Sequence, residues 1–284
     1  MMQLPALIDT HTHFDVADFD SDRLQLAELA YQRGVKALVL IGFLAERFDD
    51  MLRVQQQINH ADTAHPQALL APGLHPFYIN QHTEQHLYQL EHLIKNQPVV
   101  AIGEIGLDTF TKEMKQPAVF EKQQEFFSRQ LELAQQHDLP VLLHIRRAHA
   151  ETLALLKKHQ FKQGGIAHAF GGGVEEAKAF VKMGFKLGIT GQVTNPNARR
   201  LHQAIQAVGM DHVVLETVCP DMTPLCCQQS HEHRTRNTPA NLPYVLDSLV
   251  ATLGQEKQAL AKQIWQNSCH ALQLDWIYPH VIAT

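Results

Sequence analysis

Eight short apolar runs rich in β-branched residues alternate with longer amphipathic segments along this chain, and this repeat limits its possible folds more than any other feature. Such alternation is typical of strand–helix units built around a parallel sheet. Over 284 residues, eight units predict one α/β domain spanning residues 1–284 and folded as a (β/α)8 TIM barrel. The predicted strands are residues 6–9, 35–43, 68–75, 99–107, 139–145, 165–170, 185–191 and 213–217.

Amphipathic segments between and after the strands predict the helices. Residues 116–137 carry Phe120, Phe127 and Leu131 at helical spacing, and residues 174–183 follow three consecutive glycines. Two further helical stretches, residues 239–253 and 256–272, lie near the end of the chain. No linker or low-complexity tract interrupts this order, which favours a single domain.

Charge and cysteine content narrow the classes of function. A formal net charge of −5 argues against a protein that coats nucleic acid through a broad basic surface, so any phosphate recognition must be local. The four cysteines show no paired zinc-ribbon spacing and indicate no disulfide framework, which favours a reducing cytoplasm. No signal peptide or membrane span is recognisable, and nothing in the sequence implies a protein partner.

His11 and His13 directly follow the first apolar run. Because a strand alternates its faces, the two side chains point the same way. Two imidazoles can hold one divalent metal ion while leaving coordination positions open for water or substrate. The alternative is a chance pairing in a chain with 19 histidines, so the rest of the sequence must decide.

Ligand-type side chains also occur near the ends of other predicted strands. The C-terminal strand ends of a (β/α)8 barrel gather at one rim, where functional groups collect. A polar side chain in an apolar strand is costly to bury unless something compensates it, and metal coordination does so. The side chains placed at this rim are His11, His13, His75, Glu104, His144 and His168. The sequence predicts a metal site there, with His11, His13, Glu104, His144 and His168 as its ligands.

The motifs around these residues resemble those of TatD-type metal-dependent hydrolases, in the amidohydrolase superfamily. The resemblance runs through nearly the whole chain and is carried by residues 8–15 (IDTHTHFD), 72–76 (PGLHP), 101–108 (AIGEIGLD), 143–146 (LHIR), 167–172 (AHAFGG), 215–217 (LET) and 236–239 (RNTP).

This resemblance implies two divalent metal ions and a phosphodiester substrate, commonly DNA, so that the expected activity is that of a deoxyribonuclease. One ion would be held by His11, His13 and Glu104, and the other by the shared Glu104 with His144 and His168. Histidine and carboxylate ligands accept zinc, manganese, magnesium or nickel, so the sequence does not name the metal.

Three further side chains are candidates for contacts with substrate. Arg146 lies two residues beyond His144, on the same face of an extended segment, and its forked guanidinium suits a phosphate oxygen; the alternative is a surface arginine paired with a carboxylate. His75 and Asp108 are expected either to bind substrate or to orient a metal ligand. Arg147 is expected to be exposed to solvent.

One position departs from the family pattern. The pattern has Glu-Thr-Asp after the eighth strand, and its Asp binds the first metal and accepts a proton; here the third residue is Val218. Valine can do neither, so we expect occupied metal sites with reduced turnover.

Three groups are candidates to replace the missing carboxylate. Asp221 lies three residues downstream, although Pro220 restricts the backbone between them. Cys219 is a competent zinc ligand as a thiolate, but adjacent residues of a strand face opposite ways. The segment 226–233 is dense in ligand types without matching a defined zinc site. We therefore take Glu104, Arg146 and Asp221 as the candidate catalytic residues.

Three functions remain open. The first is an active metal-dependent phosphodiesterase. The second, favoured by Val218, is a barrel that binds metal and phosphate with little catalysis and serves a binding or regulatory role. The third is hydrolysis of C–N or lactone bonds, as in other amidohydrolases; Glu104 as the bridging group and the nearby Arg146 favour phosphate chemistry over it.

Overall fold

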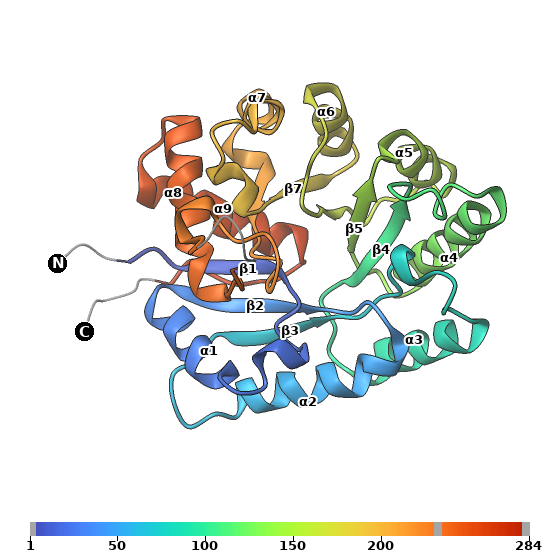
Figure 1. Cartoon of the computed structure of the whole chain (residues 1–284), viewed down its shortest axis with the longest axis horizontal. Helices are drawn as coiled ribbons and strands as arrows, with labels where there is room; N and C mark the ends of the chain where they lie inside the picture. Colours follow the sequence, from blue (N-terminus) through green and yellow to red (C-terminus); the bar gives the residue numbers. More distant parts are fainter. Residues whose placement is uncertain (1–3, 230–234, 280–284) are drawn as a thin grey trace.

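The computed structural model describes residues 4–229 and 235–279, and its strands alternate with helices around a central barrel (Figure 1). In this part of the chain the strands are β1 Leu7–Thr12, β2 Val35–Ile41, β3 Gln67–Ala71, β4 Ile102–Asp108, β5 Val141–Arg146, β6 Gly165–Ala167, β7 Phe185–Ile189 and β8 Val213–Leu215. The α-helices are α1 Arg23–Gln32, α2 Phe48–Asn59, α3 Glu84–Asn96, α4 Pro117–Gln136, α5 His149–Lys158, α6 Val174–Lys182, α7 Arg199–Val208, α8 Leu242–Leu253 and α9 Lys257–Ala271.

The strands are parallel and follow one another in sequence order. β1 to β3 are hydrogen-bonded in one run and β4 to β8 in a second. A bridge between Leu70 and Val99 joins the two runs on one side. On the other side the Val218 amide donates to the His11 carbonyl at 2.9 Å, and the His13 amide donates to Cys219 at 3.0 Å. These links complete the predicted (β/α)8 barrel.

Alternation along the strands divides the core into two layers. The larger apolar cluster lies between the strands and the surrounding helices and includes Leu38, Leu40 and Phe127. The intervening positions pack with one another in a second cluster, which includes Val39, Ile41 and Ala271. Because successive side chains of a strand face opposite ways, this second cluster is the barrel interior.

Several strands are shorter than predicted, and this moves some site residues into loops. β3 ends at Ala71, because Pro72 has no amide hydrogen to continue the ladder; His75 therefore lies beyond the strand, where it precedes the short 3-10 helix Pro76–Tyr78. β6 ends at Ala167, one residue before His168. β1 instead continues to Thr12, so His11 lies within the strand. The predicted helix 239–253 begins with a 3-10 turn before α8.

Candidate metal centre

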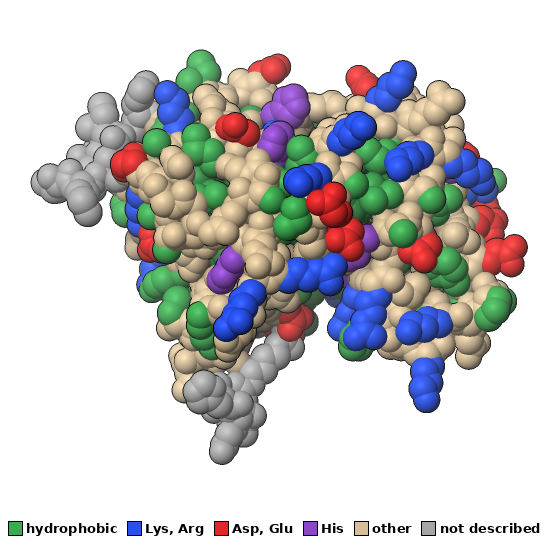
Figure 2. Space-filling model, turned by 90° about the horizontal axis from the view of Figure 1, so that it is seen from above, with side chains coloured by type: hydrophobic (Ala, Val, Ile, Leu, Met, Phe, Trp, Pro, Cys, Tyr) green, Lys and Arg blue, Asp and Glu red, His purple; other side chains and the backbone are tan. Residues whose placement is uncertain are grey.

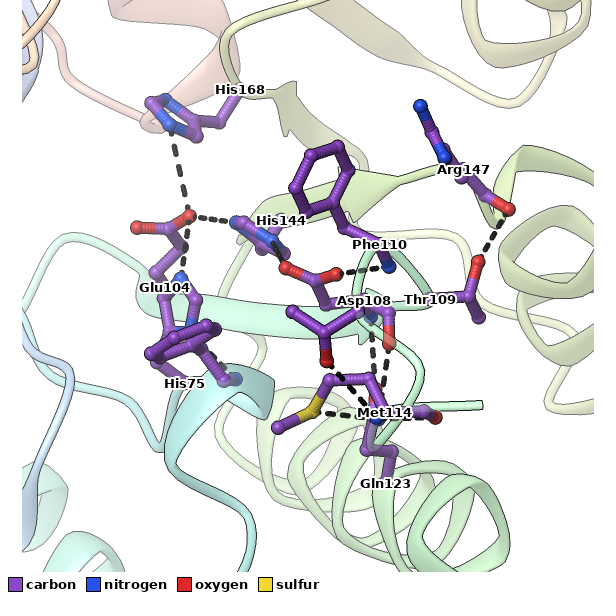
Figure 3. A network of polar contacts seen from close by, with 12 residues as sticks. His75, Glu104, Asp108, Thr109, Phe110, Met114, Gln123, His144, Arg147 and His168 are labelled. Carbon is purple, nitrogen blue, oxygen red and sulfur yellow. Dashed lines mark hydrogen bonds and ion pairs between the residues drawn. The ribbon is translucent and has the colours of Figure 1, made fainter. Parts of the chain in front are cut away.

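Glu104 of β4 is the central residue of the site. Its side chain is buried, and the imidazoles of five histidines surround its two oxygens; two of them lie in strands and three just beyond strand ends. Figure 3 shows His75, His144 and His168 around Glu104. The shortest approaches to Oε2 are 3.1 Å from His11 Nε2 and 3.5 Å from His13 Nε2. Those to Oε1 are 2.5 Å from His144 Nδ1, 3.2 Å from His75 Nε2 and 3.7 Å from His168 Nε2. Five histidines distant in sequence thus converge on one carboxylate.

Within the described residues, three groups of side chains have ligand atoms within 4.8 Å of one another. The first is the set His11, His13 and Glu104 that the resemblance implies. The second contains His75 with Glu104 and His144, so His75 occupies the place beside His144 that we expected for His168. The third joins His11, His168 and Glu216.

His168 stands between the two sides of the site. Its ring stacks on that of His11, with 3.4 Å between the ring centroids. Its Nδ1 lies 3.0 Å from Glu216 Oε2, and its Nε2 faces Glu104. His168 therefore reaches the same carboxylate as His144 while a second carboxylate holds its other nitrogen.

The protonation states suit a cation. Burial lowers the pKa of His11 to about 3 and the pKa of His168 to about 4, so both imidazoles are neutral at pH 7 and have a lone pair to donate. Burial opposes ionisation of Glu104, but the surrounding histidines, led by His75, hold its pKa well below the ordinary value. The centre thus combines neutral nitrogen donors in His11 and His168 with an ionised bridging carboxylate. At His144 burial opposes protonation, but the Glu104 and Asp108 carboxylates raise its pKa to about 9, so a metal ion bound there would displace a proton.

Buried nitrogen atoms in this centre lack partners in the described part of the chain. Both ring nitrogens of His11 and Nδ1 of His13 make no hydrogen bond there. An unpaired polar atom is costly to bury, and a bound cation removes that cost. The imidazole and carboxylate donor set also matches the ligands that zinc, manganese and related ions take. The residues present therefore fit divalent metal ions.

Two buried carboxylates hold the ligand histidines in place. Asp108 Oδ2 lies 3.1 Å from His144 Nε2, while Asp108 Oδ1 accepts a hydrogen bond from the Phe110 amide. Asp108 is only 1% exposed, so the structure places it against the ligand rather than at the cleft surface. Carboxylates that bind the second nitrogen of a ligand histidine fix its orientation and its tautomer.

Glu216 was not among the predicted site residues. It is fully buried, it accepts from the Ala169 amide at 2.9 Å, and burial raises its pKa to about 7. Its carboxylate packs on Gly188, where an added Cβ would lie 2.2 Å from either oxygen. The available signal was an acidic residue directly after the apolar run that forms β8, where an uncompensated charge would be costly.

The centre lies on one side of a cleft of about 660 Å³. Arg146 and Arg147 line this cleft together with Glu104, His144 and His168. The Arg146 guanidinium stacks 3.5 Å from the centroid of the Phe110 ring, and that of Arg147 lies 4.7 Å from the same ring. Among the described residues, no carboxylate forms an ion pair with Arg146, in contrast to the surface ion pair considered above.

Val218 and Asp221 line the same cleft beside the ligands. Val218 is 7% exposed and has a φ of 57°, in the left-handed region. Asp221 is exposed, and its amide donates to the Val218 carbonyl at 3.0 Å. Cys219 lies instead in the core, with its Sγ 2.6 Å from Thr12 Oγ1, and burial raises its pKa well above the ordinary value. A protonated thiol facing Thr12 does not replace the missing ligand.

The third candidate for the missing ligand is only partly described. Cys226 and Cys227 lie outside the three ligand groups above. Residues 230–233 of the segment lie outside the described residues.

Comparison with known proteins identifies the family. The sequence profile described as TatD related DNase matches residues 8–273. The chain is 37% identical to the Escherichia coli metal-dependent hydrolase YjjV over 76% of its own length and 80% of the relative's. It is 30% identical to a Pantoea vagans protein named 3'-5' ssDNA/RNA exonuclease TatD, covering 92% of this chain and 97% of that one.

The fold matches as well. The crystal structure of YjjV, described as a TatD homologue, superimposes with a TM-score of 0.85 at 32% identity, over 94% of this chain and 98% of that one. The match to the family profile covers most of the chain and includes each of the histidines around Glu104. The chain therefore belongs to the TatD-related DNase family of metal-dependent hydrolases.

Proposed function

We propose that this protein hydrolyses phosphodiester bonds, with a DNA strand as the substrate, using two divalent metal ions. The observation that carries the proposal is the buried Glu104 carboxylate, with two imidazoles at one oxygen and three at the other, beside a cleft lined by arginines. The relative from Pantoea vagans named as a single-strand DNA/RNA exonuclease supports the choice of substrate class.

The proposed ligand sets follow the geometry on either side of Glu104. His11, His13 and Glu104 Oε2 would hold one ion, and Glu104 Oε1, His144 and His168 the other. His75 lies within reach of the second set, which makes it a candidate ligand as well as a substrate contact. Divalent ions bound there would acidify a coordinated water and polarise a phosphoryl oxygen.

The protein's own side chains would bind and orient the substrate. Arg146 projects into the cleft from the end of β5, where its planar guanidinium can donate two hydrogen bonds to a phosphate. Asp108 acts as a positioning residue through His144. Asp221, which borders the cleft next to Val218, is the proposed proton acceptor in place of the missing carboxylate.

Val218 supports a second candidate, a barrel that binds metal and phosphate with little turnover. Its isopropyl group lies at the cleft surface next to His13 and Glu104 and offers neither a ligand nor a base. Loss of a general base typically lowers the rate by about 10²–10⁴-fold. The two candidates therefore share the same binding site and differ in rate.

One experiment separates these functions. Metal content of the purified protein is measured by elemental analysis, and hydrolysis of bis(4-nitrophenyl) phosphate is followed with and without added Mn²⁺ or Mg²⁺, with Glu104→Gln as the control. Metal-dependent cleavage that Glu104→Gln abolishes supports the phosphodiesterase. Bound metal without cleavage supports the binding role, and cleavage confined to an amide or lactone substrate would support the third chemistry.

The cytoplasm is the proposed compartment. All four cysteines are free thiols, as expected in a reducing environment. None of the helices in the described ranges combines the length and apolar character needed to cross a bilayer.

A further inference from the structure

Two hollows of different chemistry meet at the candidate metal centre. The larger is the cleft of about 660 Å³ described above, and a smaller one of about 330 Å³ adjoins it. His13, His75 and Asp221 line both. The metal ligands therefore stand at the junction of two continuous cavities, each within the size range of ligand sites.

The smaller hollow has an aromatic wall, which we call the aromatic arm: Phe43, Phe77 and Tyr78. Phe43 follows β2, while Phe77 and Tyr78 form part of the 3-10 helix after β3. The Tyr78 ring lies 5.7 Å from that of Phe43 and 5.5 Å from that of Phe77. Phe77 is 44% exposed, which leaves much of this apolar ring open to a ligand.

The aromatic arm is tied to the metal centre. The Phe77 amide donates to His75 Nδ1 at 2.9 Å, so the histidine whose Nε2 faces Glu104 also anchors the backbone of the aromatic arm. The Phe43 ring makes an edge contact with His13, at 5.5 Å between centroids. A group stacked in this hollow therefore lies next to both sides of the centre.

The larger hollow carries three guanidinium groups on the other side, which we call the arginine arm: Arg146, Arg147 and Arg200. The Phe110 ring lies under the guanidinium groups of Arg146 and Arg147. Arg147 has a φ of 57°, and Thr109 fixes this turn because its hydroxyl donates to the Arg147 carbonyl at 2.8 Å. The turned backbone and the ring hold the two guanidiniums at the cleft before any ligand arrives.

The two arms lie on opposite sides of the barrel mouth. The aromatic arm follows β2 and β3; of the arginine arm, Arg146 and Arg147 lie at the end of β5, with the ligand-bearing β4 between β3 and β5, and Arg200 lies at the start of α7 (Figure 1). Figure 2 shows Lys and Arg side chains gathered near the middle of one face, beside a histidine, although the chain has a net charge of −5.

We propose that the two arms are subsites for one nucleic acid strand: an unpaired terminal base stacks in the aromatic arm, and the phosphates beyond the bond to be cut lie in the arginine arm. This inference rests on the proposed function, because it places the phosphodiester at the metal centre. An unpaired base presents a π-face to stack, which a base within a duplex does not. The arginines match the repeated negative charge of a strand.

Binding measurements test the two proposed subsites without requiring catalytic turnover. The probe is pentathymidylate with phosphorothioate linkages, which resist hydrolysis, alongside two copies that lack either the first or the last base; affinities are measured by isothermal titration calorimetry on the purified protein. We expect removal of the base at one end only to weaken binding by about 5- to 150-fold, as for the loss of one stacked base. In Phe77→Ala that difference should vanish.

Matched variants control for general effects. Tyr88→Ala removes a 60% exposed aromatic ring on α3 that lines neither arm and should leave all affinities unchanged. Arg147→Ala should reduce the slope of log affinity against log salt by about 0.7, the value for one phosphate contact with a single strand. Arg53→Ala, an exposed arginine on α2, should not change the slope.

Each outcome decides the inference. If both end-base deletions bind like the intact strand, or if Phe77→Ala weakens all three probes equally, the aromatic subsite is wrong. An unchanged salt slope in Arg147→Ala would overturn the arginine subsite. If the affinities and salt slopes change as expected but bis(4-nitrophenyl) phosphate is not cleaved, the two subsites are supported and the proposed hydrolysis is wrong. If bis(4-nitrophenyl) phosphate is cleaved but the affinities and salt slopes do not change as expected, the subsites are wrong and the proposed hydrolysis stands.

Discussion

Replacing Val218 by aspartate is expected to raise metal-dependent phosphodiester hydrolysis by about tenfold or more. Val218 lines the same cleft as His13, Glu104 and His168, so a carboxylate at this position would enter the cavity that holds the proposed metal ligands. It would add an oxygen ligand on the His13 side and a proton acceptor. Loss of a general base costs about 10²–10⁴-fold in rate, and the exposed Asp221 is a poorer substitute than a carboxylate at position 218, so we expect a gain of tenfold or more.

The backbone at this position favours the substitution. Val218 has a φ of 57°, and the left-handed conformation costs an L-residue about 1–2 kcal/mol. Aspartate and asparagine enter this region more readily than β-branched residues. The Val218→Asp change therefore relieves strain while it adds charge beside Glu104, and we expect its stability to depend on added metal more than that of the wild type.

Val218→Asn is the matched control. It relieves the backbone in the same way and offers an oxygen, but an amide does not act as a base at neutral pH. Initial rates on bis(4-nitrophenyl) phosphate with saturating Mn²⁺, together with metal content and thermal midpoints, should show a gain in rate for Val218→Asp that Val218→Asn lacks. Equal rates for wild type and Val218→Asp at full metal occupancy would refute the reasoning and show that another group already accepts the proton.

Three further predictions concern the support of the centre and its metal. Gly188→Ala should lower the free energy of unfolding by about 1–3 kcal/mol and reduce activity, because a Cβ there would lie 2.2 Å from the Glu216 carboxylate. The control in urea unfolding is Gly171→Ala, where the nearest atom to an added Cβ is 4.0 Å away. Equal effects of the two substitutions would contradict the packing argument. Stepwise metal titration should give a weaker site on the His11 and His13 side than on the His144 side, because the former lacks the carboxylate at position 218, and equal affinities would count against this. Removal of all bound metal by a chelator should lower the melting temperature by about 5–10 °C, relative to protein with metal at 100 times its dissociation constant. Scanning calorimetry measures this shift, and an unchanged melting temperature would show that the site does not bind metal.

The barrel was accessible from the sequence because buried parallel strands and amphipathic helices have different periods. The α4 helix Pro117–Gln136 lies within one residue of the predicted segment at each end. Strand ends were less accessible, because a strand continues only while its neighbour supplies hydrogen bonds. β3 stops before Pro72, and the chain carries His75 into the site from a loop.

The contacts within the site were also only partly predictable from the sequence. The sequence marked Glu104 and its histidines because charged or polar residues in apolar strands need a partner. It did not show which partner each has. Asp108 faces His144 rather than the cleft, and Glu216, directly after β8, faces His168, which follows β6 two strands away around the barrel. Such contacts depend on how strands stagger, and one sequence without a structure does not fix that stagger.

The turn that contains Val218 is held by groups independent of its side chain. Asn237 is fully buried and donates from Nδ2 to the Thr217 carbonyl at 2.8 Å and to the Asp221 carbonyl at 2.9 Å. Asp9 accepts from the Thr217 amide at 2.9 Å, on the other side of the turn.

These bonds impose the left-handed backbone on whatever residue occupies position 218, and valine tolerates it poorly. The local conflict lies in one side chain, while the frame that would aim a carboxylate at His13 is complete. Reduced turnover in this protein would therefore follow from a single replaceable group rather than from the collapse of the centre.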